Sequence, residues 1–110
     1  MSSPRTYVSD FDNARRIAFV RSRSQAWFRN EQWDLSWEDF QAFWSTRKLW
    51  EKRGRRYDDL VLTRYDWEGP WSRDNCCIIS RLDHLRANGS NRIGKNIDKM
   101  MAGAKKYESL

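Results

Sequence analysis

Apolar residues recur at helical spacing through the first quarter of the chain. Ser9 or Asp10 can cap a helix that we expect to run from about residue 11 to residue 30. Arg15 and Arg29 fall on one side of this helix. Four apolar residues share the opposite side: Ile17, Val20, Trp27 and Phe28. The pattern predicts that the apolar face packs and that the other face is basic.

A second helical pattern begins where Ser36 stands three residues ahead of Asp39, which is the spacing of a capping box. The helix is predicted to continue to about Arg53, and Gly54 suits a left-handed C-terminal cap. Aromatic residues line one side of it, and we expect them in the core: Trp37, Phe40, Phe43, Trp44 and Trp50.

Two short apolar runs, at residues 60–62 and 76–79, are rich in strand-forming residues. A loop with a Gly69-Pro70 turn separates them, so they predict an antiparallel hairpin with a long connection. A short helix is expected at residues 83–87, ended by an Asn-Gly pair. Residues 93–107 predict a basic helix, although two glycines weaken that pattern. Three apolar residues of this last segment are expected to face inward: Ile97, Met100 and Met101.

The order of these elements predicts an α+β fold. It has N-terminal helices, a β-hairpin followed by a short helix, and a basic C-terminal tail or helix. A chain of 110 residues is too short for two self-sufficient cores. We expect a flexible leader at 1–9 and a single α+β domain at 10–90. That domain divides into a helical part at 10–56 and a hairpin-and-helix part at 57–90, and 91–110 forms the basic tail.

Basic residues outnumber acidic ones, with 21 Lys and Arg against 15 Asp and Glu and a net charge of +6. The excess is concentrated in three blocks, at 15–29, 47–56 and 86–106. Each block alone is compatible with a solvated face. Together, folded onto one surface, they would favour a nucleic-acid partner.

The sequence predicts a cytoplasmic protein without a membrane segment. No apolar run approaches the roughly 18 residues of a membrane helix, and the N-terminus lacks an apolar signal core. Cys76 and Cys77 are adjacent and would point to opposite faces of a strand, so we expect reduced packing residues. With one histidine and no C-x-x-C pair, the chain lacks the ligands of a structural zinc site.

Three polar residues of the hairpin and the following helix form the candidate catalytic site: Asp66, Asn75 and His84. Asp66 and His84 could ligate one divalent ion, such as Mg²⁺, Mn²⁺ or Ni²⁺, with water and a DNA phosphate completing the shell. Asn75 could fix the loop through backbone hydrogen bonds or could orient a base.

A spaced set of residues runs through this segment: Leu62, Arg64, Tyr65, Asp66, Gly69, Trp71, Ser72, Asn75 and Cys76, followed by Asp83 and His84 in the helix. In this order the segment resembles the small bacteriophage HNH endonuclease family, with Tyr65 in the place of an isoleucine. The resemblance covers about a quarter of the chain clearly. It implies a ββα-metal fold, one divalent ion and hydrolysis of a DNA phosphodiester, with a first-motif histidine as general base.

The chain departs from the family at that histidine. Thr63, Arg64 and Tyr65 occupy the first-motif neighbourhood, and none of them is a histidine. Arg64 cannot act as a base near neutral pH, although it can clamp a phosphate. Losing a positioned base typically forfeits about 10²- to 10⁴-fold in rate. Activity could therefore be weak, rescued by Asp66, or lost.

Each candidate residue also has an ordinary structural interpretation. Asp66 could cap the loop through an Asx-type hydrogen bond, and Asn75 could be structural. His84 could be a helix-surface histidine or a buried one with its hydrogen bonds satisfied. Trp67 and Trp71 could stack on nucleic acid, but packing across the hairpin is the commoner fate.

Two main hypotheses follow. The first is an HNH-like DNA-binding protein with metal-dependent nicking or cleavage, acting in the cytoplasm of an infected bacterium. The second is a catalytically degenerate relative that binds DNA or inhibits a host protein, such as a polymerase, a nuclease or a defence complex. A weaker third is RNA binding through exposed aromatics. The predicted nucleic-acid contacts are seven arginines: Arg53, Arg55, Arg56, Arg64, Arg73, Arg81 and Arg86.

Overall fold

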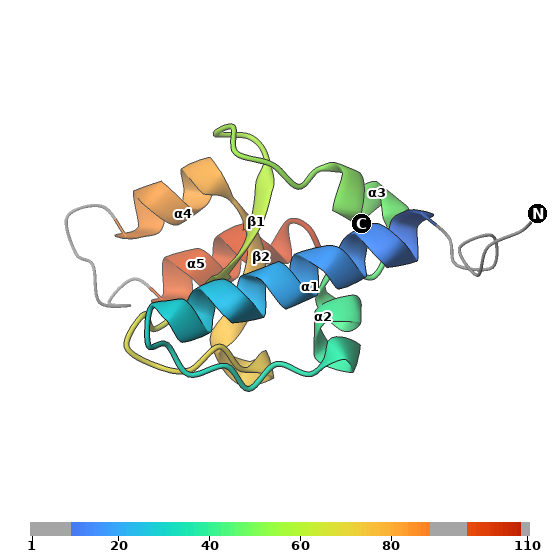
Figure 1. Ribbon diagram of the computed structural model, residues 1–110. Coiled ribbons are helices and arrows are strands. Elements are labelled where there is room, and N and C mark those ends of the chain that lie inside the picture. Colours follow the sequence, from blue (N-terminus) through green and yellow to red (C-terminus); the bar gives the residue numbers. More distant parts are fainter. Residues whose placement is uncertain (1–9, 89–96, 109–110) are drawn as a thin grey trace, which may run out of the picture.

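The computed structural model describes residues 10–88 and 97–108 (Figure 1). The predicted leader at 1–9 lies outside this range. The helices are α1 (Asp10–Phe28), α2 (Trp37–Phe43), α3 (Arg47–Glu51), α4 (Arg81–Asn88) and α5 (Ile97–Lys105). The strands are β1 (Leu60–Arg64) and β2 (Cys76–Ser80), preceded by a single 3-10 turn, η2 (Arg73–Asn75). The predicted α+β fold is confirmed.

Helix α1 packs through the face that the sequence pattern assigned to solvent. Its buried residues are Arg15, Ala18, Phe19 and Ala26. The predicted packing face is exposed instead: Ile17 by 45%, Val20 by 44%, Trp27 by 58% and Phe28 by 89%. The periodicity identified an apolar stripe correctly, but it could not say which side meets the rest of the chain.

Phe19 explains the choice of face. Its ring lies edge-on to three other aromatic rings, with centroids 5.9 Å from Trp33, 5.6 Å from Trp37 and 5.5 Å from Phe40. Arg15, on the same side, donates from Nη1 to the carbonyl oxygen of Trp44 at 2.9 Å. One aromatic cluster and one buried arginine thus fix the rotation of α1.

The predicted capping box at Ser36 is confirmed, because the Asp39 amide donates to Ser36 Oγ at 3.0 Å and the Ser36 amide donates to Asp39 Oδ2 at 3.0 Å. The single helix predicted after it is wrong. The chain breaks at Trp44, and Thr46 caps a second helix, α3, by accepting a hydrogen bond from the Leu49 amide. Local side-chain capping outcompetes continuation of the helix.

Gly54 is not the left-handed cap that we predicted, since α3 ends at Glu51 and its C-cap residue, Lys52, has right-handed geometry. Glycine is required at position 54 for a different reason. A Cβ there would overlap the carboxylate of Asp59.

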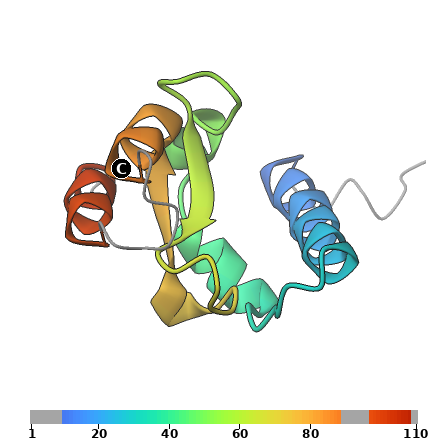
Figure 2. The ribbon, with the colours of Figure 1, turned by 90° about the vertical axis from the view of Figure 1, so that its left-hand side faces the viewer.

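Strands β1 and β2 form the predicted antiparallel hairpin, with Leu60 opposite Ser80 and Arg64 opposite Cys76. Both faces of this hairpin are covered. On one face, Leu60 and Ile78 belong to a core cluster that also contains residues of α1, α2 and α3. On the other face, Cys77 and Ile79 pack with Met100 of α5, which covers that side of the hairpin (Figures 1 and 2). Two-sided burial explains why the second strand is apolar without interruption.

The predicted core positions of the second helical pattern are confirmed: Phe40 and Trp44 are fully buried, and Trp37, Phe43 and Trp50 pack against them. Cys76 and Cys77 are buried and unbridged, as predicted. Burial raises the pKa of the Cys76 thiol to about 12 and that of Cys77 to about 11. Both therefore stay protonated at neutral pH.

The segment predicted as a basic tail contributes to the core. Met100 of α5 is fully buried against β2, whereas Met101, which we expected inside, is 52% exposed. The side chain of Ile97 lies outside the described residues. The helical residues of this segment thus form one cover of the hairpin rather than an appendage. None of the helices that the structure describes is long and apolar enough to cross a membrane.

Candidate metal site and nucleic-acid surface

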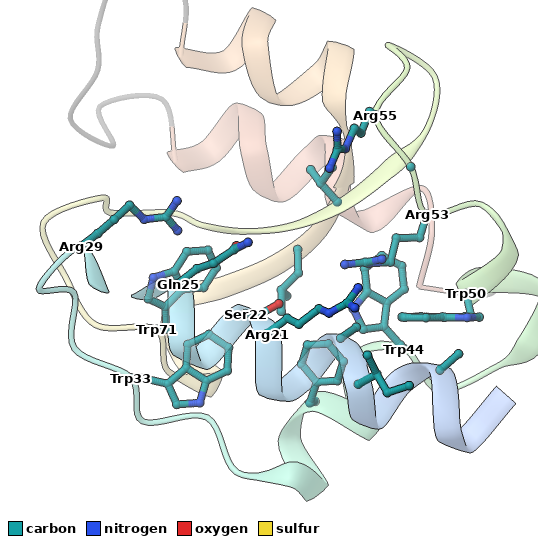
Figure 3. Close-up of a pocket in the computed structure, with 17 residues that line it drawn as sticks. Arg21, Ser22, Gln25, Arg29, Trp33, Trp44, Trp50, Arg53, Arg55 and Trp71 are labelled. Atoms are coloured by element: carbon teal, nitrogen blue, oxygen red, sulfur yellow. The ribbon is translucent and has the colours of Figure 1, made fainter. Parts of the chain in front are cut away.

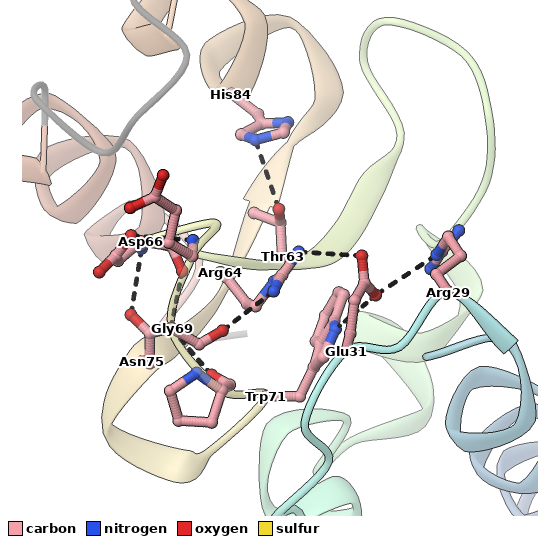
Figure 4. Close-up of polar contacts among 11 residues, drawn as sticks. Arg29, Glu31, Thr63, Arg64, Asp66, Gly69, Trp71, Asn75 and His84 are labelled. Carbon is pink, nitrogen blue, oxygen red and sulfur yellow. Dashed lines mark hydrogen bonds and ion pairs between the residues drawn. The ribbon is translucent and has the colours of Figure 1, made fainter. Parts of the chain in front are cut away.

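Asn75 holds the hairpin loop closed. Its Nδ2 donates to the carbonyl oxygens of Asp66 at 2.9 Å and Pro70 at 2.8 Å, and its Oδ1 accepts from the Asp66 amide at 3.1 Å (Figure 4). Both amide hydrogens are therefore used within the loop. A Cβ at Gly69 would lie 2.9 Å from Nδ2, which explains the glycine at that position. Of the two roles that the sequence left open for Asn75, this geometry favours loop fixation.

Asp66 begins the same loop. Its Oδ1 accepts a hydrogen bond from the Glu68 amide at 3.0 Å, which is an Asx turn. Among the described residues, no hydrogen-bond donor to the other carboxylate oxygen, Oδ2, is found. The residue therefore has a structural role and keeps one oxygen for a cation or for water.

His84 lies on α4 against the opposite face of β1 from Arg64. Its Nε2 is 3.3 Å from Thr63 Oγ1, and its ring lies 5.6 Å from the Trp67 ring, centroid to centroid. Burial, reinforced by the charge of Arg81, lowers the pKa of His84 below the usual histidine value. The imidazole is therefore neutral at pH 7, which is the form that binds metals.

Trp67 directly follows Asp66, and its ring lies beside that of His84 at an interplanar angle of 55°. The loop that carries Asp66 and the helix that carries His84 therefore lie in the same part of the molecule (Figure 4). Asp66 and His84 stay the two candidate ligands that the sequence named for a divalent ion. Within the described part of the chain, no group of three or more His, Cys, Asp or Glu residues could hold a metal. Asp66 and His84 alone would leave most of the coordination shell of such an ion to water and phosphate oxygens.

Arg64 is not placed to contact a phosphate, which corrects its assignment to the nucleic-acid surface. Its side chain is only 11% exposed. Nη1 donates to the carbonyl oxygen of Gly69 at 2.9 Å, Nη2 pairs with Glu31 Oε2 at 3.2 Å, and the guanidinium lies 4.8 Å from the Trp71 ring. Arg64 instead ties the loop to the connector after α1.

Glu31 is the centre of that contact, and the sequence analysis missed it. Its Oε1 accepts from Trp71 Nε1 at 3.0 Å and from Arg29 Nε at 3.3 Å (Figure 4). Burial alone would raise the pKa of Glu31, but the hydrogen bond from Trp71 and the charges of Arg64 and Arg29 lower it below the usual value. In the sequence, Glu31 is marked only as the first acidic residue after a long basic stretch. That position does not indicate that its partner is Arg64, 33 residues further along the chain.

The other six predicted arginines are exposed: Arg53, Arg55, Arg56, Arg73, Arg81 and Arg86. Two backbone hydrogen bonds bring part of this set together. The Arg81 amide donates to the carbonyl oxygen of Asp59 at 2.9 Å, and the Leu82 amide donates to that of Tyr57 at 2.8 Å. The basic loop after α3 is therefore pinned to the start of α4.

Trp71 packs rather than projecting outward, with its ring 5.8 Å from that of Trp33 and its indole nitrogen bonded to Glu31. Trp67 is at the edge of exposure, at 36%. The loop therefore offers one partly exposed ring beside His84.

Comparisons of the chain with protein-family models, curated proteins and solved structures gave no match.

Proposed function

We propose that this protein binds duplex DNA through a basic surface formed by the loop after α3 and the start of α4. The observation that carries the proposal is the backbone pairing of residues 57–59 with Arg81 and Leu82, which joins two basic segments that are distant in sequence. Exposed arginines on one surface neutralise phosphates and release counterions, which is the main source of affinity for duplex DNA.

A double substitution tests this surface. Arg56→Gln/Arg81→Gln removes two exposed charges, and Lys48→Gln/Lys105→Gln is the matched control on α3 and α5. We expect the first variant to weaken duplex binding and to reduce the salt slope of log K by about 1.8, at roughly 0.9 per lost phosphate contact. Fluorescence anisotropy with a labelled duplex measures both quantities. Equal effects in the two variants would contradict a specific surface.

The same experiment separates DNA binding from the inhibitor hypothesis. An unchanged DNA affinity in Arg56→Gln/Arg81→Gln would favour a protein target, such as a host polymerase, nuclease or defence complex. An HNH-like protein in either role would act in the cytoplasm of an infected bacterium.

A second candidate function is metal-dependent nicking of the bound DNA. It is favoured by the neutral imidazole of His84 beside the loop that carries Asp66. A bound divalent ion would stabilise charge on the scissile phosphate. Asp66 and His84 would hold it, and Asn75 would keep the loop in place. No histidine stands at the first-motif position, so water would need another base.

Nicking is tested with supercoiled plasmid and Mg²⁺, Mn²⁺ or Ni²⁺. Asp66→Asn is the sharpest variant, because it keeps the oxygen that accepts from Glu68 while removing the charge that a cation needs. We expect Asp66→Asn and His84→Gln each to abolish relaxation while leaving duplex binding intact. Absence of relaxation by the unsubstituted protein at high concentration would exclude this activity and leave the binding proposal standing.

A further inference from the structure

A groove of about 750 Å³ runs between α1 and the rest of the protein. Its wall on one side is formed by α1, and the opposite wall is formed by α3, the following loop and β1 (Figure 3). This volume is within the roughly 300–1,000 Å³ typical of ligand sites. Arg21 on α1 and Arg29 directly after it line the groove and do not belong to the duplex-binding surface proposed above.

Four arginines line the groove: Arg21, Arg29, Arg53 and Arg55. All four are exposed, and the lining residues include no aspartate or glutamate. In Figure 3, Arg29 lies at one end, with Arg53 and Arg55 toward the other and Arg21 between them. Arg29 also pairs with Glu31 at 3.3 Å, so the positive charge of the groove comes mainly from Arg21, Arg53 and Arg55. Charges spread over several positions suit an extended polyanion better than a single small anion.

Arg53 shows how poorly this charge is balanced. Partial burial lowers the pKa of the Arg53 guanidinium, and the neighbouring charge of Arg55 lowers it further. An anion placed between these two side chains would favour the charged form of both guanidinium groups.

Aromatic side chains form the apolar part of the same groove. Trp33, Trp50 and Trp71 line it, and each of these residues is half-buried. The guanidinium of Arg53 lies 5.0 Å from the centroid of the Trp50 ring. Planar arginine and indole groups of this kind are the surfaces on which unpaired bases stack.

We propose that the groove between α1 and the hairpin binds a single-stranded polynucleotide, with its phosphates on the arginines and its bases against the tryptophans. Bases of a duplex are stacked on each other and cannot reach these rings without being extruded. An acidic peptide could pair with the arginines of the groove, but its carboxylates would not stack on the tryptophan rings. The groove shares Arg53 and Arg55, in the loop after α3, with the duplex surface, but Arg21 and Arg29 on its other side lie outside that surface.

Three probes of equal length test the groove: an oligothymidylate, an oligouridylate and an abasic phosphodiester strand, each about ten nucleotides long. We expect the abasic strand to bind at least about tenfold more weakly than the thymidylate, since stacking contributes at every base. Equal binding of the abasic strand would overturn the proposal, because it would show recognition of charge alone. A preference between thymidylate and uridylate would show which of the two strand types, differing in sugar and in the base methyl group, the groove favours, and would support the site in either direction.

Arg21→Gln/Arg29→Gln locates the binding, with Lys48→Gln/Lys105→Gln again as the matched control. We expect the salt slope for oligothymidylate to fall by about 1.4 in the groove variant only, at roughly 0.7 per phosphate contact for single strands. Thermal unfolding of both variants checks that they fold. Duplex affinity should be the same in the groove variant and in the control.

Loss of duplex and single-strand binding by the same factor in Arg21→Gln/Arg29→Gln would overturn the inference, as would an effect no larger than that of the control. Loss of duplex binding alone in Arg56→Gln/Arg81→Gln, with single-strand binding retained, would support both proposals.

Discussion

At the scale of single residues, Asn75 illustrates how a polar side chain in a loop can resemble a catalytic group while acting as a clamp. Its three hydrogen bonds join Asp66 and Pro70 across the turn. The sequence could place this asparagine in the loop, but the choice between clamp and catalyst depends on which backbone groups come within reach. That geometry is set by Gly69 and by the hairpin register.

Asn75→Ala should destabilise the protein by about 2–3 kcal/mol, because it leaves one backbone donor and two carbonyl acceptors without their partner. Asp74→Ala, at the exposed neighbouring position, should cost less than about 0.5 kcal/mol. Urea unfolding measures both. Similar small effects for the two variants would show that the loop does not depend on the amide.

His84 provides a prediction on pH. Its folded-state pKa is lowered, so the unfolded chain binds the proton more tightly than the folded one. The stability that His84 contributes is therefore fully present above its unfolded pKa of about 6.5, and it is lost as the pH falls through the folded pKa. Unfolding free energies should drop between about pH 7 and pH 5 in the original chain and drop less in His84→Gln. Superimposable pH profiles would contradict a buried neutral imidazole.

At the scale of elements, the hairpin and the aromatic helix were predictable because strand-forming runs and a capping box are local signals. The rotation of α1 was not, since Ile17 and Phe19 offer competing apolar faces and only the position of Trp37 and Phe40 decides between them. The break at Trp44 was also missed, because the Thr46 cap is too short a signal to interrupt a continuous aromatic stripe.

Helix α5 is the element whose sequence was most misleading. Gly103 weakened its helical pattern, yet this glycine allows the helix to approach β2. A Cβ at position 103 would lie 2.9 Å from Ile79 Cδ1 and 3.3 Å from Asp83 Cβ. The low helix propensity of the glycine is offset by the close packing that it permits.

Gly103→Ala should therefore destabilise the protein, by roughly 1 kcal/mol net, although alanine is the better helix former. Overpacking against the fully buried Ile79 costs about 1–3 kcal/mol, and the gain in propensity is about 1 kcal/mol. Ala102→Gly, at the exposed neighbouring position, should also cost about 1 kcal/mol, through propensity alone. A higher melting temperature for Gly103→Ala would show that α5 does not pack this closely.

At the scale of the whole molecule, the net charge predicted an anionic partner. It could not predict which arginines are buried and which are exposed. Arg64, in the middle of the motif, is inside, whereas Arg21 and Arg29, which no motif marked, line a groove. Of the candidate site, the loop position of Asp66 and Asn75 and the helical position of His84 were predictable from order along the chain. Their hydrogen bonds to Glu68, Pro70 and Thr63 were not, because these depend on the geometry of the folded loop and of α4 against β1.

The proposed phosphate-binding surface consists of two basic segments that are joined where residues 57–59 meet the start of α4. Its most direct test is the affinity of the unsubstituted protein for a labelled duplex between about 50 and 200 mM salt. Log K should fall linearly with log salt concentration, with a slope that reports several phosphate contacts. Undetectable binding at the lowest salt, or an affinity that does not change with salt, would contradict the account.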